Sequence, residues 1–449
     1  LLGASAGFAQ EPAPDKELAP DKEPAPDKEL APDKELAPDK GPATTVLRGR
    51  LYQPAQEPIA DGAVVIKEGK IVAAGAWARL ERLVPAGAHV ISVPAISPGL
   101  IEASSSAGTS GIYAEQRSEI VPELRVIDEV DLRDRAFDRL LERGVTTVHI
   151  DPDPASVVGS QGCVVKTGGQ ARIVIEAGVI GGDLGPEAWT RGFNRRPGRT
   201  PTHMTRRPNT LMGAVWVFRE AFFLAKQAKT PTPAQAVLRE VMAGKRGLHF
   251  LARRRGEIEA ALRVSKEAGV RIVLKEAQEV HHILDVVADH EASVIYGPLQ
   301  DLSESQQRGV LQPRLDTPAL LALSGVPFCL TAGGEQGHDD LRGQALLAIR
   351  HGLEASVALD AVTAAPAAIL GLEKRLGTLS KGFDADLVVW SGPPLSATSK
   401  LLAVLIDGQV VSGSLIQPKA KPASGDPKGK PAPNKNKTPR DPKKSPQRF

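Results

Sequence analysis

A few histidines and acids are the residues of this sequence best suited to catalysis. His149 ends an apolar run and is closely followed by Asp151, Glu276 ends a second run, and His338 and Asp339 stand in a glycine-rich segment. Imidazole and carboxylate groups are common ligands of zinc, and a bound metal ion turns water into a hydroxide nucleophile near neutral pH. If His149, Glu276, His338 and Asp339 converge, they could form a metal site.

Each of these side chains also has an ordinary structural interpretation. His149 suits the polar end of a strand, and His338 with its neighbouring acids suits the start of a helix, where acids complement the helix dipole. His281 and His282 share a predicted helix with Asp285 and Asp289, which is typical of a solvated face. We favour the ordinary interpretation, because a zinc site needs several converging ligands that other groups hold in position.

Other catalytic patterns are weaker. Ser104-Ser105-Ser106 offers hydroxyl groups, but the sequence has no G-x-S-x-G elbow around a nucleophile. The glycine-rich stretch from Gly159 to Gly169 lacks the Lys-Ser/Thr pair of a phosphate loop and the spacing of a dinucleotide fingerprint. Residues 191–207 carry six arginines and are predicted to form a loop that either binds an anion or is simply solvated.

Composition excludes several classes of protein. The 449 residues allow one large domain and a smaller one, and no run of 18 apolar residues predicts a membrane span. The net charge of +3 hides a negative segment at 11–40 and a basic one at 419–449, and the body between them is close to neutral. We therefore expect no nucleic-acid binding. The two cysteines, Cys163 and Cys329, are expected to be free.

The two ends of the sequence are unlike the body. Residues 1–10 are apolar and then small, as at the end of a secretory signal peptide, so we expect export to the periplasm or the extracellular space. Residues 11–40 are five proline-containing hexapeptides and are predicted to be a disordered spacer. Residues 419–449 form a second disordered segment, either a solvated linker or a basic tail that contacts an anionic surface.

Strand patterns occur near both ends of the body. Residues 46–52 alternate, and residues 63–66 and 71–74 flank a glycine turn as a hairpin does. Residues 385–390 and 403–411 predict further strands, with a turn at Asp407-Gly408. These patterns indicate one small β-domain to which both ends contribute.

The middle of the sequence repeats a different pattern, in which a helix ends at glycine and a β-branched run follows. Gly144, Gly269 and Gly325 each stand at such a junction, and a helix predicted at 280–289 leads into a strand at 293–296. Repeated helix-to-strand units imply a parallel sheet, and about 270 residues of them suit a barrel of eight strands. Periodicity alone does not separate a closed barrel from an open, doubly wound sheet.

Four stretches resemble the amidohydrolase superfamily, in particular its imidazolonepropionase-like group. They are VVIKEGKIVAAG followed by ISPGLIEA, LLERGVTTVHI, VVGSQGCVVKTGG, and TAAPAAILGLEKRLGTLSKGFDADLVVWSGPPL. The resemblance implies an α/β fold, a TIM (β/α)8 barrel of the metal-dependent hydrolase type with a small β-sandwich built from both chain ends. It implies a barrel at 97–375 and a sandwich at 41–96 and 376–418.

The resemblance also implies where zinc or another divalent metal is held, and these positions are altered. The family's first-strand pattern P-G-L-I-D-x-H-x-H has Ser104 and Ser106 in place of its histidines. The fifth-strand histidine falls on Leu251 or Arg253, and the sixth on Glu276. The aspartate after the eighth strand falls on Gly333, and no residue is assigned after the fourth strand. We predict no metal cofactor, because serine, leucine, arginine and glycine side chains are poor ligands or none.

The sequence thus predicts an amidohydrolase-family protein with a degenerate metal centre. Family chemistry is hydrolysis of non-peptide C–N bonds, often in cyclic amides, and the changed positions favour a non-catalytic or strongly altered member acting in binding or support. The alternative is an active hydrolase with a rearranged or metal-free site, so enzymatic activity stays undecided. A small molecule at the barrel mouth is the expected partner, and homo-oligomerisation is left open.

Overall fold

The computed structural model describes residues 44–110, 115, 118–152, 154–190, 207–299, 313–333 and 340–415. The predictions for residues 1–10, 11–40 and 419–449, and nearly all of the arginine-rich segment 191–207, lie outside these residues. His338 and Asp339 lie outside them too. No helix in the described ranges has the length and apolar character needed to cross a membrane.

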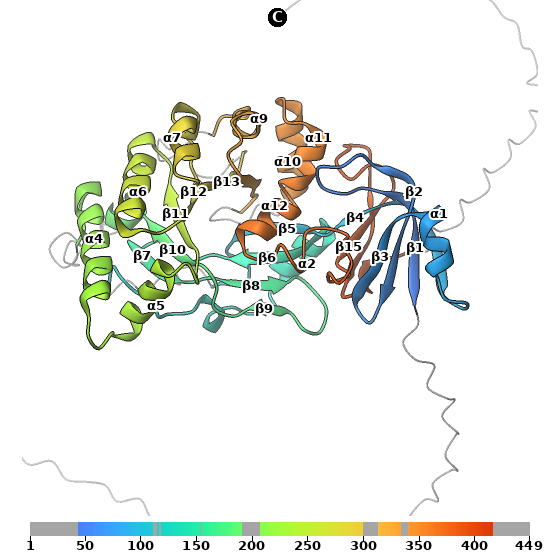
Figure 1. Cartoon of the computed structure of the whole chain (residues 1–449), viewed down its shortest axis with the longest axis horizontal. Helices are drawn as coiled ribbons and strands as arrows, with labels where there is room; N and C mark the ends of the chain where they lie inside the picture. Colours follow the sequence, from blue (N-terminus) through green and yellow to red (C-terminus); the bar gives the residue numbers. More distant parts are fainter. Residues whose placement is uncertain are drawn as a thin grey trace, which may run out of the picture. The chain divides into compact units, whose positions relative to one another are not determined.

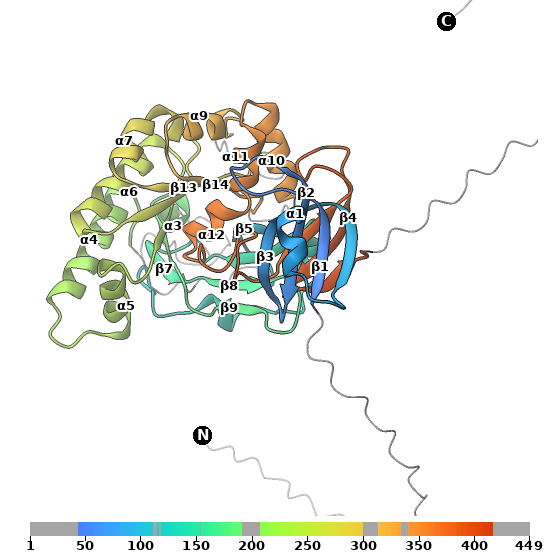
Figure 2. The same ribbon diagram turned by 45° about the vertical axis from the view of Figure 1, so that its right-hand side comes forward.

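The fold is mixed α/β (Figures 1 and 2). The strands are β1 (Thr45–Leu51), β2 (Ile59–Lys67), β3 (Lys70–Ala76), β4 (His89–Pro98), β5 (Leu100–Ser105), β6 (Val145–Ile150), β7 (Val158–Gln161), β8 (Cys163–Lys166), β9 (Ile173–Ile175), β10 (Ile180–Asp183), β11 (Leu248–Ala252), β12 (Ile272–Glu276), β13 (Ser293–Tyr296), β14 (Phe328–Leu330), β15 (Leu387–Trp390), β16 (Leu401–Ile406) and β17 (Gln409–Gly413). The α-helices are α1 (Trp77–Leu80), α2 (Arg135–Glu142), α3 (Pro186–Thr190), α4 (Leu211–Gln227), α5 (Pro233–Met242), α6 (Arg255–Ala268), α7 (Leu284–Asp289), α9 (Thr317–Leu323), α10 (Leu341–Arg350), α11 (Ala355–Asp360) and α12 (Ala364–Ile369).

A seven-stranded sheet draws its strands from both ends of the described chain, in the order β17-β16-β15-β4-β1-β2-β3 (Figure 2). β4 connects the two groups, because it pairs with β1 on one side and with β15 on the other. Along β1 the neighbours Val46 and Leu47 enter different apolar clusters, as the two-residue period of a strand requires. The sheet's two groups of strands therefore depend on each other for their hydrogen bonds.

The remaining strands form a six-stranded sheet, β14-β13-β12-β11-β10-β7, and a four-stranded sheet, β5-β6-β8-β9. Strands β10 to β14 are parallel, as the helix-to-strand pattern predicts, and Gly269 ends α6 in the left-handed conformation. No closed ladder joins the two sheets within the described residues. The reason is local: β7 pairs antiparallel at the edge of β10, and β8 pairs antiparallel with β6, so neither sheet continues as a parallel ladder there.

The helix expected at 280–289 is wrong in one detail. The chain forms a short 3-10 turn at Val280–His282 and a separate helix α7, with Ile283 at φ −145° between them. His281 and His282 therefore precede the helix that carries Asp285 and Asp289. Both cysteines are free and buried, as the sequence predicts.

Helices pack on one face of the six-stranded sheet, and their apolar contacts decide which strand residues face the other way. Phe250 of β11 packs against Phe218 of α4, with ring centroids 5.4 Å apart. Because side chains alternate along a strand, His249 and Leu251 point away from this helical layer. His249 faces β6 of the four-stranded sheet, and that is where polar groups collect.

Candidate functional site

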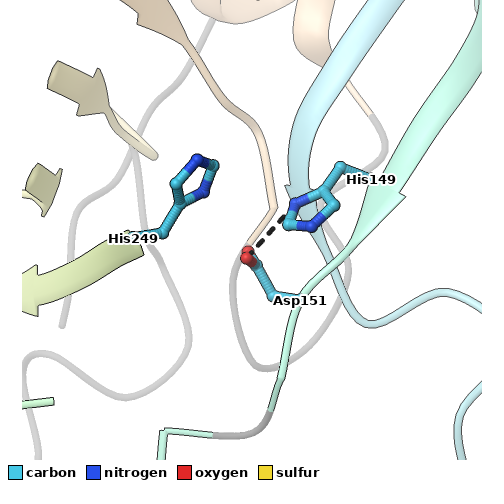
Figure 3. Close-up of side chains that lie close together, drawn as sticks. All are labelled: His149, Asp151 and His249. Atoms are coloured by element: carbon cyan, nitrogen blue, oxygen red, sulfur yellow. Dashed lines mark ion pairs between the residues drawn. The ribbon is translucent and has the colours of Figure 1, made fainter. Parts of the chain in front are cut away.

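The polar cluster between the two sheets contains His149, Asp151, His249 and Lys275. His149 is the next-to-last residue of β6, Asp151 follows the strand, and His249 and Lys275 come from the neighbouring strands β11 and β12 (Figure 3 shows the first three). The rings of His149 and His249 meet edge to face, with centroids 5.5 Å apart. All four side chains are buried.

Lys275 supplies the positive charge of this cluster. Its Nζ atom lies 2.7 Å from Oδ2 of Asp151, and the hydroxyl of Ser104 donates to the same carboxylate oxygen. Burial alone would raise the pKa of Asp151, but the groups around it, the Lys275 ammonium foremost, outweigh this and lower it. The site therefore holds a buried carboxylate already paired with a cation.

Both histidines are neutral at physiological pH. Burial lowers the pKa of His149, and it lowers that of His249 to about 3 with help from the neighbouring imidazole. Nδ1 of His149 lies 3.0 Å from the carbonyl oxygen of Ala103 and 3.3 Å from Oδ1 of Asp151. Two acceptors around one nitrogen require a proton on it, so Nδ1 is a donor.

Three ligand atoms of His149, Asp151 and His249 lie within 4.8 Å of one another, which is close enough to ask whether they could hold a metal. The atoms do not fit this use well. Nδ1 of His149 is committed as a donor, and its Nε2 lies 2.3 Å from the position that a Cβ on Gly162 would occupy, so it faces the backbone of Gly162. A divalent ion about 4 Å from the Lys275 ammonium would be repelled by about 8 kcal/mol at an effective dielectric constant of about 20.

The family's expected ligand positions are engaged in other contacts. Arg253, just after β11, forms ion pairs with Glu276, at the end of β12, and with Glu187, whose Oε1 lies 2.6 Å from Nη1 of Arg253. Burial alone would lower the pKa of Arg253, but the two carboxylates raise it well above its usual value. Leu251 is buried, and Ser106 accepts hydrogen bonds from Thr109 through its carbonyl oxygen. Glu276 is thus drawn into a salt bridge, rather than left available as a ligand.

Gly333 lies against the end of β5. A Cβ at position 333 would be 1.5 Å from the carbonyl oxygen of Ser104, so an aspartate there would force the two segments apart. Glu102 of β5 joins the same segments, because its carboxylate accepts hydrogen bonds from the Thr331 hydroxyl and from the backbone N–H of Ala332 at 2.9 Å. Burial raises the pKa of Glu102 to about 7.

The backbone near Glu276 is strained. Glu276 has φ 64° and Ala277 has φ 34°, both in the left-handed region that side chains rarely adopt. Such strain costs about 1–3 kcal/mol for each residue and persists only where surrounding contacts hold it. Here the ion pair with Arg253 holds Glu276 at the carboxyl end of β12.

Some site residues follow from the sequence and others do not. The sequence identifies His149, and the structure places it in the cluster with Asp151. It does not identify His249 and Lys275 as partners, although alternation along β11 and β12 would have placed both on the face opposite Phe250. Asp183 ends β10 and was not assigned at all; it is fully buried, and burial raises its pKa well above the usual value.

A second polar cluster lies where the four-stranded and seven-stranded sheets meet. Lys166 of β8 is buried and forms ion pairs with Asp384, Asp386 and Asp407, at Nζ–oxygen distances of 2.8, 3.1 and 2.6 Å. Asp384 also accepts from Arg375 at 3.0 Å. This cluster joins the two sheets, and neither His149 nor His249 takes part in its ion pairs, so we regard it as structural.

Comparisons with known proteins agree with the fold. The model of the amidohydrolase family, Amidohydro_3, matches residues 332–412. The solved structure of an amidohydrolase from Thermotoga maritima MSB8 is 26% identical, covers 82% of this chain and 100% of its own, and superposes with a TM-score of 0.71. An ochratoxinase from A. niger is 15% identical, with a TM-score of 0.56 and coverage of 84% of this chain and 97% of its own.

A curated relative, "Amidohydrolase tasK" of Hapsidospora irregularis, is 45% identical over 65 residues. That match spans 14% of this chain and 7% of the relative, so it informs one segment only. The family match, this segment and the Thermotoga structure all point to a resemblance to the amidohydrolase superfamily.

Proposed function

We propose that this chain is an amidohydrolase that has exchanged its metal centre for internal ion pairs and acts by binding a small molecule or supporting a partner. The observation that carries the proposal is the pairing of two buried cations with carboxylates, one of them at expected ligand positions and the other next to them along β12. Arg253 pairs with Glu276 and Glu187, and Lys275 pairs with Asp151. A cation in each place removes the unpaired negative charge that would attract a divalent metal.

The proposed binding region is the carboxyl end of strands β10 to β14, where proteins of this architecture form their sites. We further propose that the six-stranded and four-stranded sheets are two arcs of the family's (β/α)8 barrel, at 97–375. On this view the seven-stranded sheet is the small β-sandwich of residues 41–96 and 376–418. Membership in the imidazolonepropionase-like group and export from the cytoplasm belong to the same proposal.

A second function is favoured by one observation. Neither ring nitrogen of His249 has a hydrogen-bond partner among the described residues, although the side chain is 1% exposed. An unsatisfied buried polar group costs about 1–3 kcal/mol, so such a group often has a use. The alternative is therefore a metal-free hydrolase in which neutral His249 takes a proton from the water that attacks the carbonyl carbon and returns it to the nitrogen that leaves as the C–N bond breaks, while Lys275 stabilises the negative charge that develops on the carbonyl oxygen.

Hydrolysis assays on cyclic amides and dipeptides, after treatment with a chelator, separate the two functions. The binding proposal expects no turnover above that of His249→Ala protein. Turnover that survives chelation and falls at least about 100-fold in His249→Ala, the usual range for a general base, would support the metal-free hydrolase instead. Turnover that chelation abolishes and zinc restores would refute both.

A further inference from the structure

Helix α4 presents apolar side chains to solvent along one face. Met212, Trp216 and Phe223 are 78%, 58% and 61% exposed, although large apolar side chains normally pack inside a protein. Together with Arg219, these side chains form a single helical stripe, because Met212, Trp216, Arg219 and Phe223 stand at positions i, i+4, i+7 and i+11. We call Met212, Trp216, Arg219 and Phe223 the α4 face.

The opposite side of α4 explains why this helix is ordered without burying the α4 face. Ala214, Phe218, Phe222 and Ala225 are buried in the main apolar core, and Thr210 caps the helix start by accepting from the N–H of Gly213 at 3.1 Å. Both views show α4 on the outer side of the helices that cover the six-stranded sheet (Figures 1 and 2). The stripe is therefore additional to what packing of the helix requires.

We propose that the α4 face is a dimer interface that pairs with the α4 face of a second copy in antiparallel orientation. The pattern is self-complementary about a twofold axis at its middle, between positions 217 and 218. That axis places Met212 opposite Phe223 of the second copy, and Trp216 opposite Arg219. An apolar pair and a cation–π pair then form twice, which is what an isologous interface requires.

The charges on the stripe fit the same partner. Arg219 donates hydrogen bonds of 2.6 and 2.8 Å to Glu267 of α6, and both side chains of this pair stay partly exposed beside the apolar residues of the α4 face. The exposed parts of Trp216 and Phe223 come to about 240 Å² per chain if a free aromatic side chain offers about 200 Å². A small interface buries about 600 Å² or less per partner, so the dimer is expected to be weak and reversible. This inference is independent of the proposed function.

The test is the solution mass of the full chain by size exclusion with light scattering and by sedimentation over a range of concentrations. We expect a monomer–dimer equilibrium, with Trp216→Glu raising the dissociation constant roughly tenfold or more. Leu323→Glu is the matched control, because Leu323 is 84% exposed on α9, outside the α4 face, and its substitution is expected to leave the constant unchanged. Phe223→Glu gives a second variant if Trp216→Glu protein is poorly folded by circular dichroism.

Cysteine cross-linking tests the orientation, since the two native cysteines are buried. A short bismaleimide should cross-link the M212C/F223C double variant into a dimer. It should also cross-link a mixture of the two single variants into heterodimers. Each single variant alone should stay uncross-linked. A wild-type chain that is monomeric at every concentration, a dimer unaffected by both glutamate variants, or efficient cross-linking of M212C alone would overturn the proposal.

Discussion

Replacing Lys275 by methionine removes the cation on which the buried carboxylate of Asp151 depends. The two side chains are 11% and 7% exposed, and Nζ lies 2.7 Å from Oδ2. Removing one partner of a buried ion pair costs about 3–5 kcal/mol, because the other charge is left uncompensated. The Ser104 hydroxyl still donates to Asp151, so we expect the lower end, about 3 kcal/mol of unfolding free energy.

The pH dependence of this loss follows from the pKa of Asp151, which Lys275 lowers below its usual value. A group with a depressed pKa in the folded state stabilises the protein above its unfolded pKa and loses that contribution as the pH falls. The difference between wild type and Lys275→Met should thus be complete at pH 7 and shrink only as the pH falls below about 3.8, through the lowered pKa of Asp151 in the folded state. In the double variant with Asp151→Asn, no charge is left unpaired, and much of the stability should return.

The assay is equilibrium unfolding in urea at pH 7 and at lower pH, with equal m-values as the condition for comparison. Arg255→Ala is the control, because its pair with Glu259 is 59% and 41% exposed, and such pairs contribute about 0.5 kcal/mol or less. A Lys275→Met protein within about 0.5 kcal/mol of wild type at pH 7, the ordinary range for surface substitutions, would refute the reasoning that the pair is essential.

Four further predictions concern other parts of the chain. Burial raises the pKa of Glu102 from 4.5 to about 7, so the unfolded state releases this proton at a lower pH than the folded state does. The wild-type free energy of unfolding should therefore fall by about 3 kcal/mol, relative to that of Glu102→Gln, as the pH rises between these two values. The same pH dependence of the unfolding free energy in both proteins, measured in urea, would contradict this. Lys166→Met should lower the unfolding free energy by about 3 kcal/mol, measured by urea unfolding, because it removes the cation shared by Asp384, Asp386 and Asp407, and Arg375 still pairs only with Asp384. A neutral effect would show the cluster to be dispensable. Deleting residues 385–418 should cause aggregation, seen by gel filtration, because β4 loses its partner β15. Soluble, cooperatively melting protein after that deletion would refute this. Removing residues 11–40 and 419–449 should shift the melting temperature by no more than a few degrees.

The sequence predicts the fold's elements well where a pattern is local. The glycine after α6 and the β-branched run of β12 are both short-range signals, and the structure confirms them. The antiparallel insertions β7 and β8 escaped prediction, because four-residue strands carry too little periodicity to distinguish them from a loop.

The site could be predicted only in part for a different reason. The departures from the family pattern at Ser104 and Gly333 can be found by comparing motifs, but the ion pairs that engage Arg253 and Glu276 are long-range. Arg253 lies 23 residues from Glu276 and 66 from Glu187, and nothing along the chain pairs them before the strands are placed side by side. Lys275 was identified by neither motif nor spacing, since its role depends on Asp151 from another sheet.

The metal content of the purified chain tests the central claim most directly. After dialysis without chelator, elemental analysis for zinc, iron, manganese, nickel and copper should find far less than one ion per chain, and added zinc should not raise the melting temperature. One tightly held ion per chain that is lost in His249→Ala, or a melting temperature that rises with zinc in wild type but not in that variant, would contradict the account of a metal centre exchanged for ion pairs.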